Sequence, residues 1–220
     1  DNLPAFPDIP PMRRKTSILQ EIPHISPPPQ ISIDELEEVK RHQGAAQQDA
    51  TRSILIKIFN NSFIDDFIKL LPPGNGHHIR PILEVLHSDC EILINREKAY
   101  HGRLRPRIWA KRHHIPFHAY EIGTEKNPAY PSFHAATSKL FALFLSELFP
   151  HKKELFEQLA NSISQSRLDA GVHFPSDITG GIEWAEKAWS AAKNRGLRPE
   201  SIAVGDNYGT HAPMPMEPLR

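Results

Sequence analysis

Proline is concentrated at the two ends of this 220-residue chain and is less frequent between them. Eight of the 21 prolines fall within residues 1–30, and four more follow Gly196. Because proline lacks an amide hydrogen and clashes with the preceding turn, the N-terminal segment cannot form a continuous helix. The sequence therefore predicts a Pro-rich N-terminal arm (1–30), extended near Pro27–Pro29, a helical domain (31–195) and a loosely packed C-terminal tail (196–220).

Between these ends, apolar residues recur at the spacing of amphipathic helices. Ser32 is a favourable N-cap, and it predicts one long helix from Ile33 to about Phe59. Further helices are expected over residues 63–71, after Pro81, over 91–103, from Ser132 to Pro150, around 155–163 and over 175–194. No segment alternates convincingly as a strand does, so the expected fold is all-α, with a single helical-bundle domain.

Composition excludes several classes of protein. The formal net charge is zero, which argues against a general nucleic-acid coat or a polybasic membrane binder. No apolar run approaches the ~18–20 residues that span a bilayer. Cys90 is the single cysteine, so an intrachain disulfide and a zinc site of the CxxC kind are both excluded.

Three polar clusters interrupt the helical pattern. In the first, Lys98 and Arg105 are seven residues apart and Pro106 follows. Two helical turns separate the two cations, so both can project from one face and clamp an oxyanion. The alternative is a solvated basic face, since seven lysines and arginines lie between Arg96 and His118.

The second cluster is Pro131-Ser132-Phe133-His134, at the start of a predicted helix. Helix N-termini carry unpaired amide donors and bind phosphate-like anions. An ordinary Pro-Ser cap with an incidental histidine is the competing interpretation.

The third cluster is Ser166-Arg167-x5-His173-x3-Asp177. Arg167 lies on the apolar stripe of its helix, where an unpaired guanidinium is costly and needs an anion. Asp177 can fix the tautomer of His173 and leave its other ring nitrogen as a nucleophile or base. A structural His–Asp bond, with Arg167 paired internally, is the alternative.

Together the clusters resemble the signature of the phosphatidic acid phosphatase type 2 superfamily: Lys-x6-Arg-Pro, Pro-Ser-Gly-His and Ser-Arg-x5-His-x3-Asp. That superfamily includes bacterial class A non-specific acid phosphatases, membrane lipid phosphatases and vanadium haloperoxidases. The resemblance covers about residues 27–193 and is strongest to the class A enzymes. It implies a metal-independent acid phosphatase that acts through a phosphohistidine.

The resemblance also assigns roles residue by residue. It implies that His173 attacks phosphorus, that Asp177 orients His173, and that His134 protonates the leaving alcohol. It further implies that the phosphate is held by Lys98, Arg105, Ser132, the backbone at Phe133, and Arg167. Phosphate or vanadate is expected in the site, with no cofactor and no metal ion.

Phe133 departs from the family motif, which has glycine at that position. If the loop needs a positive φ, phenylalanine would distort the phosphate pocket. Otherwise the ring can form an aromatic wall that selects the leaving group. Phe133 thus leaves a weakened phospholigand-binding protein as one alternative. Two others are a phosphotransferase, if an alcohol captures the phosphohistidine, and a vanadate-dependent haloperoxidase, if vanadate occupies the oxyanion site.

Partners and location follow from the same resemblance. The expected partners are small phosphomonoesters, without nucleic acid or membrane insertion, and the class A relatives imply a homo-oligomer. The resemblance also implies a periplasmic or secreted protein.

Overall fold

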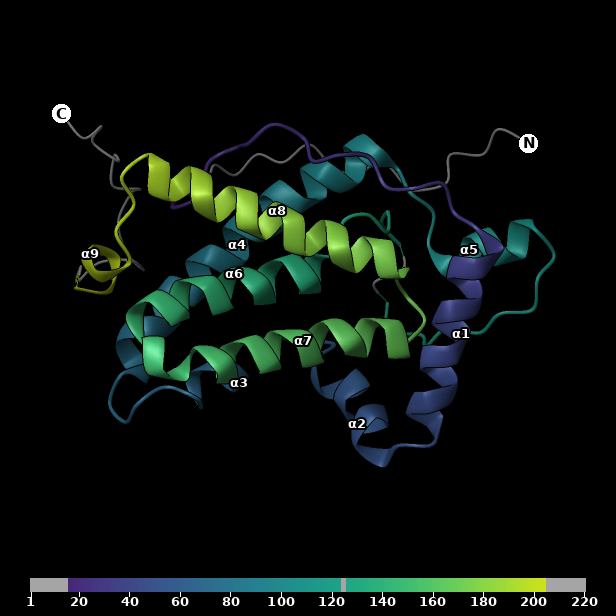
Figure 1. Ribbon diagram of the computed structural model, residues 1–220, viewed down its shortest axis with the longest axis horizontal. Coiled ribbons are helices and arrows are strands. Elements are labelled where there is room, and N and C mark those ends of the chain that lie inside the picture. Colours follow the sequence, from purple (N-terminus) through teal and green to yellow (C-terminus); the bar gives the residue numbers. More distant parts are fainter. Residues whose placement is uncertain (1–15, 124–125, 205–220) are drawn as a thin grey trace.

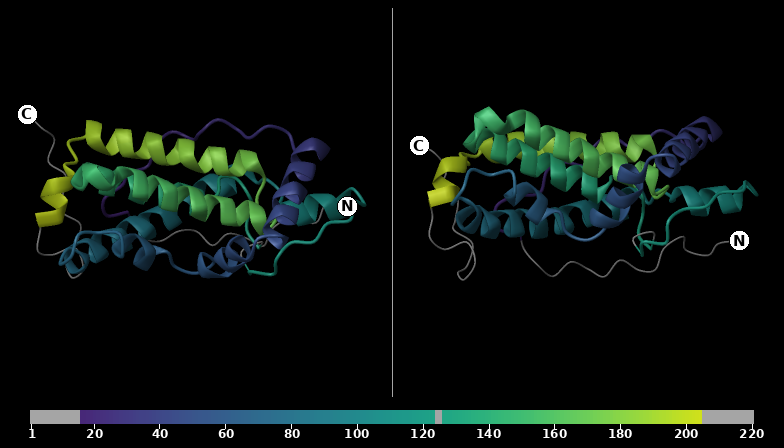
Figure 2. Two further views of the ribbon diagram at one scale, coloured as in Figure 1. Left: turned by 60° about the horizontal axis from the view of Figure 1, so that its bottom comes forward. Right: turned by 90° about the horizontal axis from the view of Figure 1, so that it is seen from below.

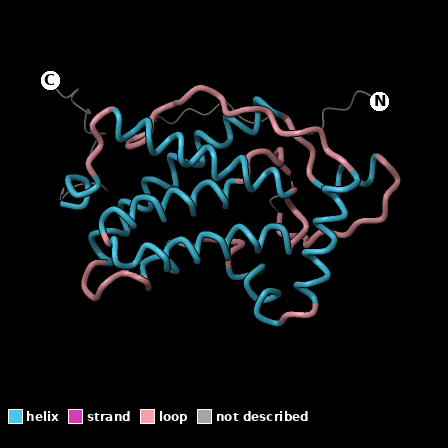
Figure 3. Tube along the Cα trace, in the orientation of Figure 1, coloured by secondary structure: helices cyan, strands magenta, loops and turns pink. Residues whose placement is uncertain are grey.

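The computed structural model describes residues 16–123 and 126–204, and all regular structure within these ranges is helical (Figures 1 and 3). The all-α prediction is therefore confirmed. The helices are α1 (Ile33–Gln47), α2 (Ala50–Ile58), α3 (Ile64–Ile68), α4 (Gly76–His101), α5 (Pro106–Arg112), α6 (Phe133–Leu148), the 3-10 turn η1 (Pro150–Lys152), α7 (Lys153–Asp169), α8 (Pro175–Asn194) and α9 (Pro199–Val204).

Helix α6 is the centre of the bundle and packs against α4, α7 and α8 (Figures 1 and 2). Its side chains are buried nearly all round, as the apolar run Leu140–Leu145 predicts. Phe141 and Phe144 are fully buried, and Trp184 and Trp189 of α8 complete the same core. The end of the bundle at which α6 and α8 begin is also the end at which α4 and α7 finish.

Two predicted helix boundaries were wrong. The expected helix over residues 33–59 is two helices, because Asp49 has an extended backbone and caps α2 by accepting hydrogen bonds from the amides of Thr51 and Arg52. Conversely, the two helices expected after Pro81 and over 91–103 are one helix, α4. Pro81 lies in its second turn, where the lost amide removes one hydrogen bond from a helix of 26 residues.

Residues 16–32 of the N-terminal arm form neither helix nor strand, and residues 17–19 lie against α4. Asp89 of α4 is 2% exposed, and its carboxylate accepts the amides of Ser17, Ile18 and Leu19 at 2.7–2.8 Å. Ile18 and Leu19 are themselves buried in the core. This part of the arm is therefore bound to the bundle, and residues 1–15 of the predicted arm lie outside the described ranges.

The C-terminal residues differ from the loosely packed tail that the sequence predicted. Leu197 and Ile202 are buried in the core, and α9 lies against α4 and α6. Their apolar side chains explain this packing, because burial of one such side chain contributes about 1.5–3 kcal/mol. The remainder of the predicted tail, residues 205–220, lies outside the described ranges. The division of the chain at residues 30 and 195 stays a prediction.

Candidate active site

The side chains predicted to bind phosphate gather where α6 and α8 begin. A pocket of about 200 Å³ opens there. Its lining is His87, Glu91, Asn95, Lys98, Arg105, Asn127, Phe133, His134, Arg167 and His173. Ser132 and Asp177 are fully buried and joined to each other, since the Ser132 amide donates to the Asp177 carbonyl at 3.0 Å. The structure thus brings all eight predicted site residues into one region.

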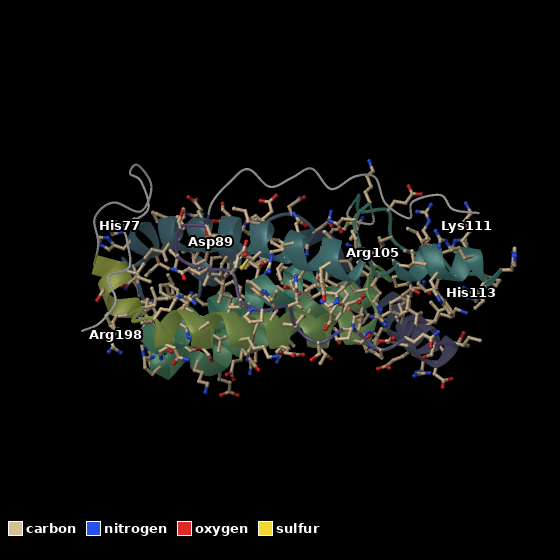
Figure 4. All side chains as sticks on the ribbon, turned by 90° about the horizontal axis from the view of Figure 1, so that it is seen from above. His77, Asp89, Arg105, Lys111, His113 and Arg198 are labelled. Carbon is tan, nitrogen blue, oxygen red and sulfur yellow. The ribbon has the colours of Figure 1, made fainter. Side chains whose placement is uncertain are left out.

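The first cluster reaches the pocket because α4 ends abruptly beyond Lys98. Gly102 adopts a left-handed conformation, with φ +59°, and turns the chain out of the helix. Arg105 is then the N-cap of α5, where Pro106 occupies the first helical position. Lys98 and Arg105 are each 2% exposed. Figure 4 shows Arg105 within the body of the molecule, while Lys111 of the same basic stretch lies near its outer end.

The second cluster is held by close packing of α8 against the start of α6. Ser132 caps α6, and its hydroxyl oxygen accepts the Ala135 amide at 3.2 Å. A Cβ atom on Gly181 would lie 2.7 Å from the Ser132 carbonyl oxygen, and one on Gly180 would meet the Tyr130 ring. Only glycine permits this approach, which fixes the loop before α6 against α8. The role of Ser132 as a phosphate ligand stays a prediction.

The third cluster forms the expected His–Asp pair. His173 Nδ1 lies 3.2 Å from Asp177 Oδ2, and its Nε2 lies 2.9 Å from Arg105 Nη1. Because arginine can only donate, Nε2 accepts and the ring proton is assigned to Nδ1. His173 therefore presents an unprotonated Nε2 beside the pocket.

Lys98 and Arg167 are buried cations held by neutral oxygens. Lys98 donates to the side-chain oxygen of Asn127 and to the Pro128 carbonyl, at 3.1 and 2.9 Å. Arg167, 1% exposed, donates to the Ile56 carbonyl (2.8 Å), Asn60 Oδ1 (3.3 Å) and Ser166 Oγ (3.0 Å). These contacts orient both side chains and leave their positive charge available to an anion in the pocket.

The clustered cations change the protonation of their neighbours. Burial, followed by the charges of Arg105, Lys98 and Arg167, lowers the pKa of His173 well below its usual value. Burial and the charge of Arg167 do the same to the pKa of His134. His134 Nε2 lies 2.8 Å from the Phe59 carbonyl oxygen and donates to it, so Nδ1 is its proton-exchanging nitrogen. Both histidines are therefore neutral in the free protein at neutral pH.

Phe133 occupies the first position of α6 and has an ordinary helical backbone. Among the described residues, the one non-glycine residue with positive φ is His114. The substitution of the motif glycine therefore causes no strain here. The Phe133 ring is half-buried and lies edge-on to His87 and His134, with centroids 5.2 and 5.9 Å apart. It forms an aromatic wall of the pocket.

Sequence reasoning missed two polar side chains at the site. Asn127 Oδ1 accepts from both Lys98 Nζ and Arg105 Nη2, the latter at 2.6 Å, and so aligns these two cations. Arg103 is buried and lies 2.7 Å from Asp177. Arg103 stood inside the basic stretch that could equally have been a solvated face, and nothing in its spacing set it apart. Asn127 lies in a loop without a recognisable motif.

In the described ranges, no three His, Cys, Asp or Glu side chains are grouped so as to hold a metal ion. Over those same residues, none of the helices combines the length and apolar character that a bilayer crossing requires.

Known proteins resemble this chain over the segment that carries the site. The sequence profile of the PAP2 superfamily matches residues 84–188, which include the three clusters. A non-specific acid phosphatase of Salmonella typhimurium strain LT2 is 34% identical over 84 residues, which are 38% of this chain and 33% of that protein. The chain thus matches about a third of the length of this curated relative.

Among solved structures, a bacterial vanadium-dependent iodoperoxidase has the same fold, with a TM-score of 0.63 and 17% identity. The superposition covers 79% of this chain and 52% of the iodoperoxidase. The superfamily profile matches the segment that supplies the pocket residues, and the fold agrees with it. Over residues 84–188, this chain is therefore similar to the PAP2 superfamily.

Proposed function

We propose that this protein is a metal-independent phosphomonoesterase of the non-specific acid phosphatase kind, with small phosphomonoesters as substrates. One observation carries the proposal: the unprotonated Nε2 of His173 lies beside the same small pocket as Lys98, Arg105 and Arg167. A nucleophile surrounded by cations suits a tetrahedral dianion. The acid phosphatase of Salmonella typhimurium, matched over part of its length, supports this choice.

In the first step, His173 Nε2 attacks phosphorus and the bond to the ester oxygen breaks. Lys98, Arg105 and Arg167 stabilise the negative charge on the three non-bridging oxygens as the transition state forms. Protonated His134 gives its Nδ1 proton to the departing alkoxide and becomes neutral. The products are an alcohol and a phosphohistidine, whose positive ring Asp177 stabilises through Nδ1.

In the second step, neutral His134 takes a proton from water, and the resulting hydroxide attacks phosphorus. The P–N bond breaks, inorganic phosphate leaves, and His173 regains its lone pair. An alcohol in place of water would instead yield a new phosphomonoester, which is the phosphotransferase reaction.

The first test is hydrolysis of p-nitrophenyl phosphate from about pH 4 to 8 with a chelator present. Because burial and then the nearby cations lower the pKa of His134, this histidine gains its proton only as the pH falls below neutral. We therefore expect kcat/KM to increase from neutral toward acidic pH and to decline again once His173 or Asp177 is protonated. Loss of turnover on chelation, or a rate that increases steadily toward alkaline pH, would contradict the proposal.

Phe133 is expected to select the leaving group. In Phe133→Gly, the aromatic wall is lost while the backbone amide stays in place. We expect kcat/KM for p-nitrophenyl phosphate to fall by about 2- to 12-fold relative to that for glycerol phosphate, since one ring contact contributes about 0.5–1.5 kcal/mol. The ratio of the two kcat/KM values measures this selectivity.

Phe117→Leu is the matched control, because Phe117 packs in the separate cluster of Leu36, Val39, Ala110 and Phe174. It should leave the ratio unchanged. An unchanged ratio in Phe133→Gly would show that the ring does not contact the leaving group.

Peroxidase activity is the second candidate function, because a pocket that binds phosphate also fits vanadate and the structural neighbour is a vanadium-dependent iodoperoxidase. When bound, vanadate would supply peroxide activation, and Lys98, Arg105 and Arg167 would hold its oxygens. Iodide oxidation that requires added vanadate and peroxide separates it from the phosphatase. Periplasmic or secreted placement and a homo-oligomeric state remain proposals that follow from the resemblance to the class A acid phosphatases.

A further inference from the structure

The carboxylate of Asp177 is shared between the proposed nucleophile and a second cation. One oxygen, Oδ2, faces His173 Nδ1 at 3.2 Å and accepts the Phe174 amide at 2.8 Å. The other, Oδ1, accepts a hydrogen bond from Arg103 Nη1 at 2.7 Å. Asp177 is fully buried, so these groups determine both its position and its charge.

Arg103 is in turn held from its far side by α1. Its Nη2 atom donates to Glu35 Oε2 at 3.0 Å and to the Pro29 carbonyl at 3.1 Å. Glu35 also accepts the Ser176 amide at 2.9 Å, beside Asp177 on α8. The guanidinium carbon lies 4.8 Å from the centre of the Phe174 ring. The side chains of Glu35, Arg103 and Asp177 are 13%, 4% and 0% exposed, respectively.

From this geometry we infer that Arg103, oriented by Glu35, is a positioning residue for the reaction: it keeps Asp177 ionised and aimed at His173 Nδ1. The inference rests on the proposed function and assigns a role to two residues outside the three motifs. Arg103 contacts neither the pocket nor the phosphate ligands, so it acts through Asp177.

The charges around Asp177 show why Arg103 is needed. Burial raises the pKa of Asp177, and Arg103 is the largest opposing influence, through its charge and its hydrogen bond. Arg105 also lowers the pKa of Asp177, but to a smaller extent. Glu35 faces Arg103 from α1, His173 faces Asp177 from the loop before α8, and Lys98 faces the same region from α4. Removal of Arg103 would therefore favour protonation of Asp177. A protonated Asp177 can itself donate a hydrogen bond, so it no longer holds His173 in the tautomer with the proton on Nδ1.

The test compares Arg103→Gln and Arg103→Lys with the wild type in two measurements. The first is kcat and KM for p-nitrophenyl phosphate across the acidic range. The second is nitrogen NMR of the His173 ring, which reports its tautomer without requiring turnover. Arg52→Gln is the matched control, because it removes another arginine from a buried carboxylate, Asp169, at 2.6 Å.

In Arg103→Gln we expect kcat to fall about 10- to 100-fold with KM little changed, since partners that orient a reacting group have effects of this size. The acidic limb of the pH profile should move to higher pH, and His173 should show mixed tautomers at a pH where the wild type shows Nδ1–H alone. Arg103→Lys should recover part of the activity, because it keeps the charge without the two-pronged geometry.

A purely structural role would give a different pattern. Arg103→Gln would then lose thermal stability as Arg52→Gln does, while its pH profile and the His173 tautomer stayed as in the wild type, and the inference would be wrong. If the wild type hydrolyses no phosphomonoester, the proposed function fails, yet the NMR comparison still decides whether Arg103 controls the His173 tautomer.

Discussion

Replacement of His173 by alanine is expected to lower phosphomonoester hydrolysis by about 10⁴-fold or more. The substitution removes Nε2, which is the unprotonated nitrogen beside the pocket, and with it the covalent route. The three cations would remain, so phosphate should still bind. The measurement is kcat for p-nitrophenyl phosphate, together with phosphate affinity from titration calorimetry.

Free imidazole provides the sharpest control for this variant. It can enter the space left by the His173 ring and restore part of the turnover, with phosphoimidazole as the initial product. His113→Ala, at an exposed histidine beyond α5, should behave as the wild type. Near wild-type turnover in His173→Ala would remove the phosphohistidine from the mechanism and leave direct attack by water.

Arg167→Met is expected to affect activity and stability differently. Loss of one cation that stabilises the transition state should reduce kcat/KM by about 10²- to 10³-fold. Burial lowers the pKa of Arg167 to about 10, which shows that the fold holds this charge at a cost in stability. Methionine has a similar length and no charge, so the melting temperature without phosphate should stay the same or rise.

Arg52→Met is the control for this comparison. Arg52 pairs with the buried carboxylate of Asp169, so its removal leaves an uncompensated charge and should lower the melting temperature while activity persists. Added phosphate should raise the melting temperature of the wild type more than that of Arg167→Met. A large drop in melting temperature for Arg167→Met would instead make this arginine a structural element of the fold.

The sequence was sufficient for the parts of the site that occur as spaced motifs. Lys98, His134 and His173 each lie within a local pattern that has a chemical meaning, and the fold class follows from helical periodicity. Arg103 and Asn127 were missed because their importance depends on which groups they meet in space. Asp177, the partner of Arg103, is 74 positions away along the chain.

Helix boundaries were the weakest part of the prediction, because they too depend on more than the local sequence pattern. Asp49 caps α2 and so separates it from α1. The two helices both pack on α7, and this arrangement cannot be read from the sequence around Asp49. The sequence predicts a helix boundary at Pro81, yet a proline in the second turn of a helix removes only one hydrogen bond.

The contacts that Arg103 makes with Glu35, Ser176 and Asp177 also determine when during folding the site can form. Glu35 and Ser176 are separated by 141 positions, and Arg103 joins them from the middle of the chain. Contacts this distant in sequence incur a large loop-closure entropy and are late events in folding. A nascent or partly folded chain therefore carries the proposed nucleophile, the cations and the proposed orienting carboxylate as separate groups. Catalytic competence arises only once the ends of the helical domain have met, so enzymatic activity would report complete folding more strictly than helix content does.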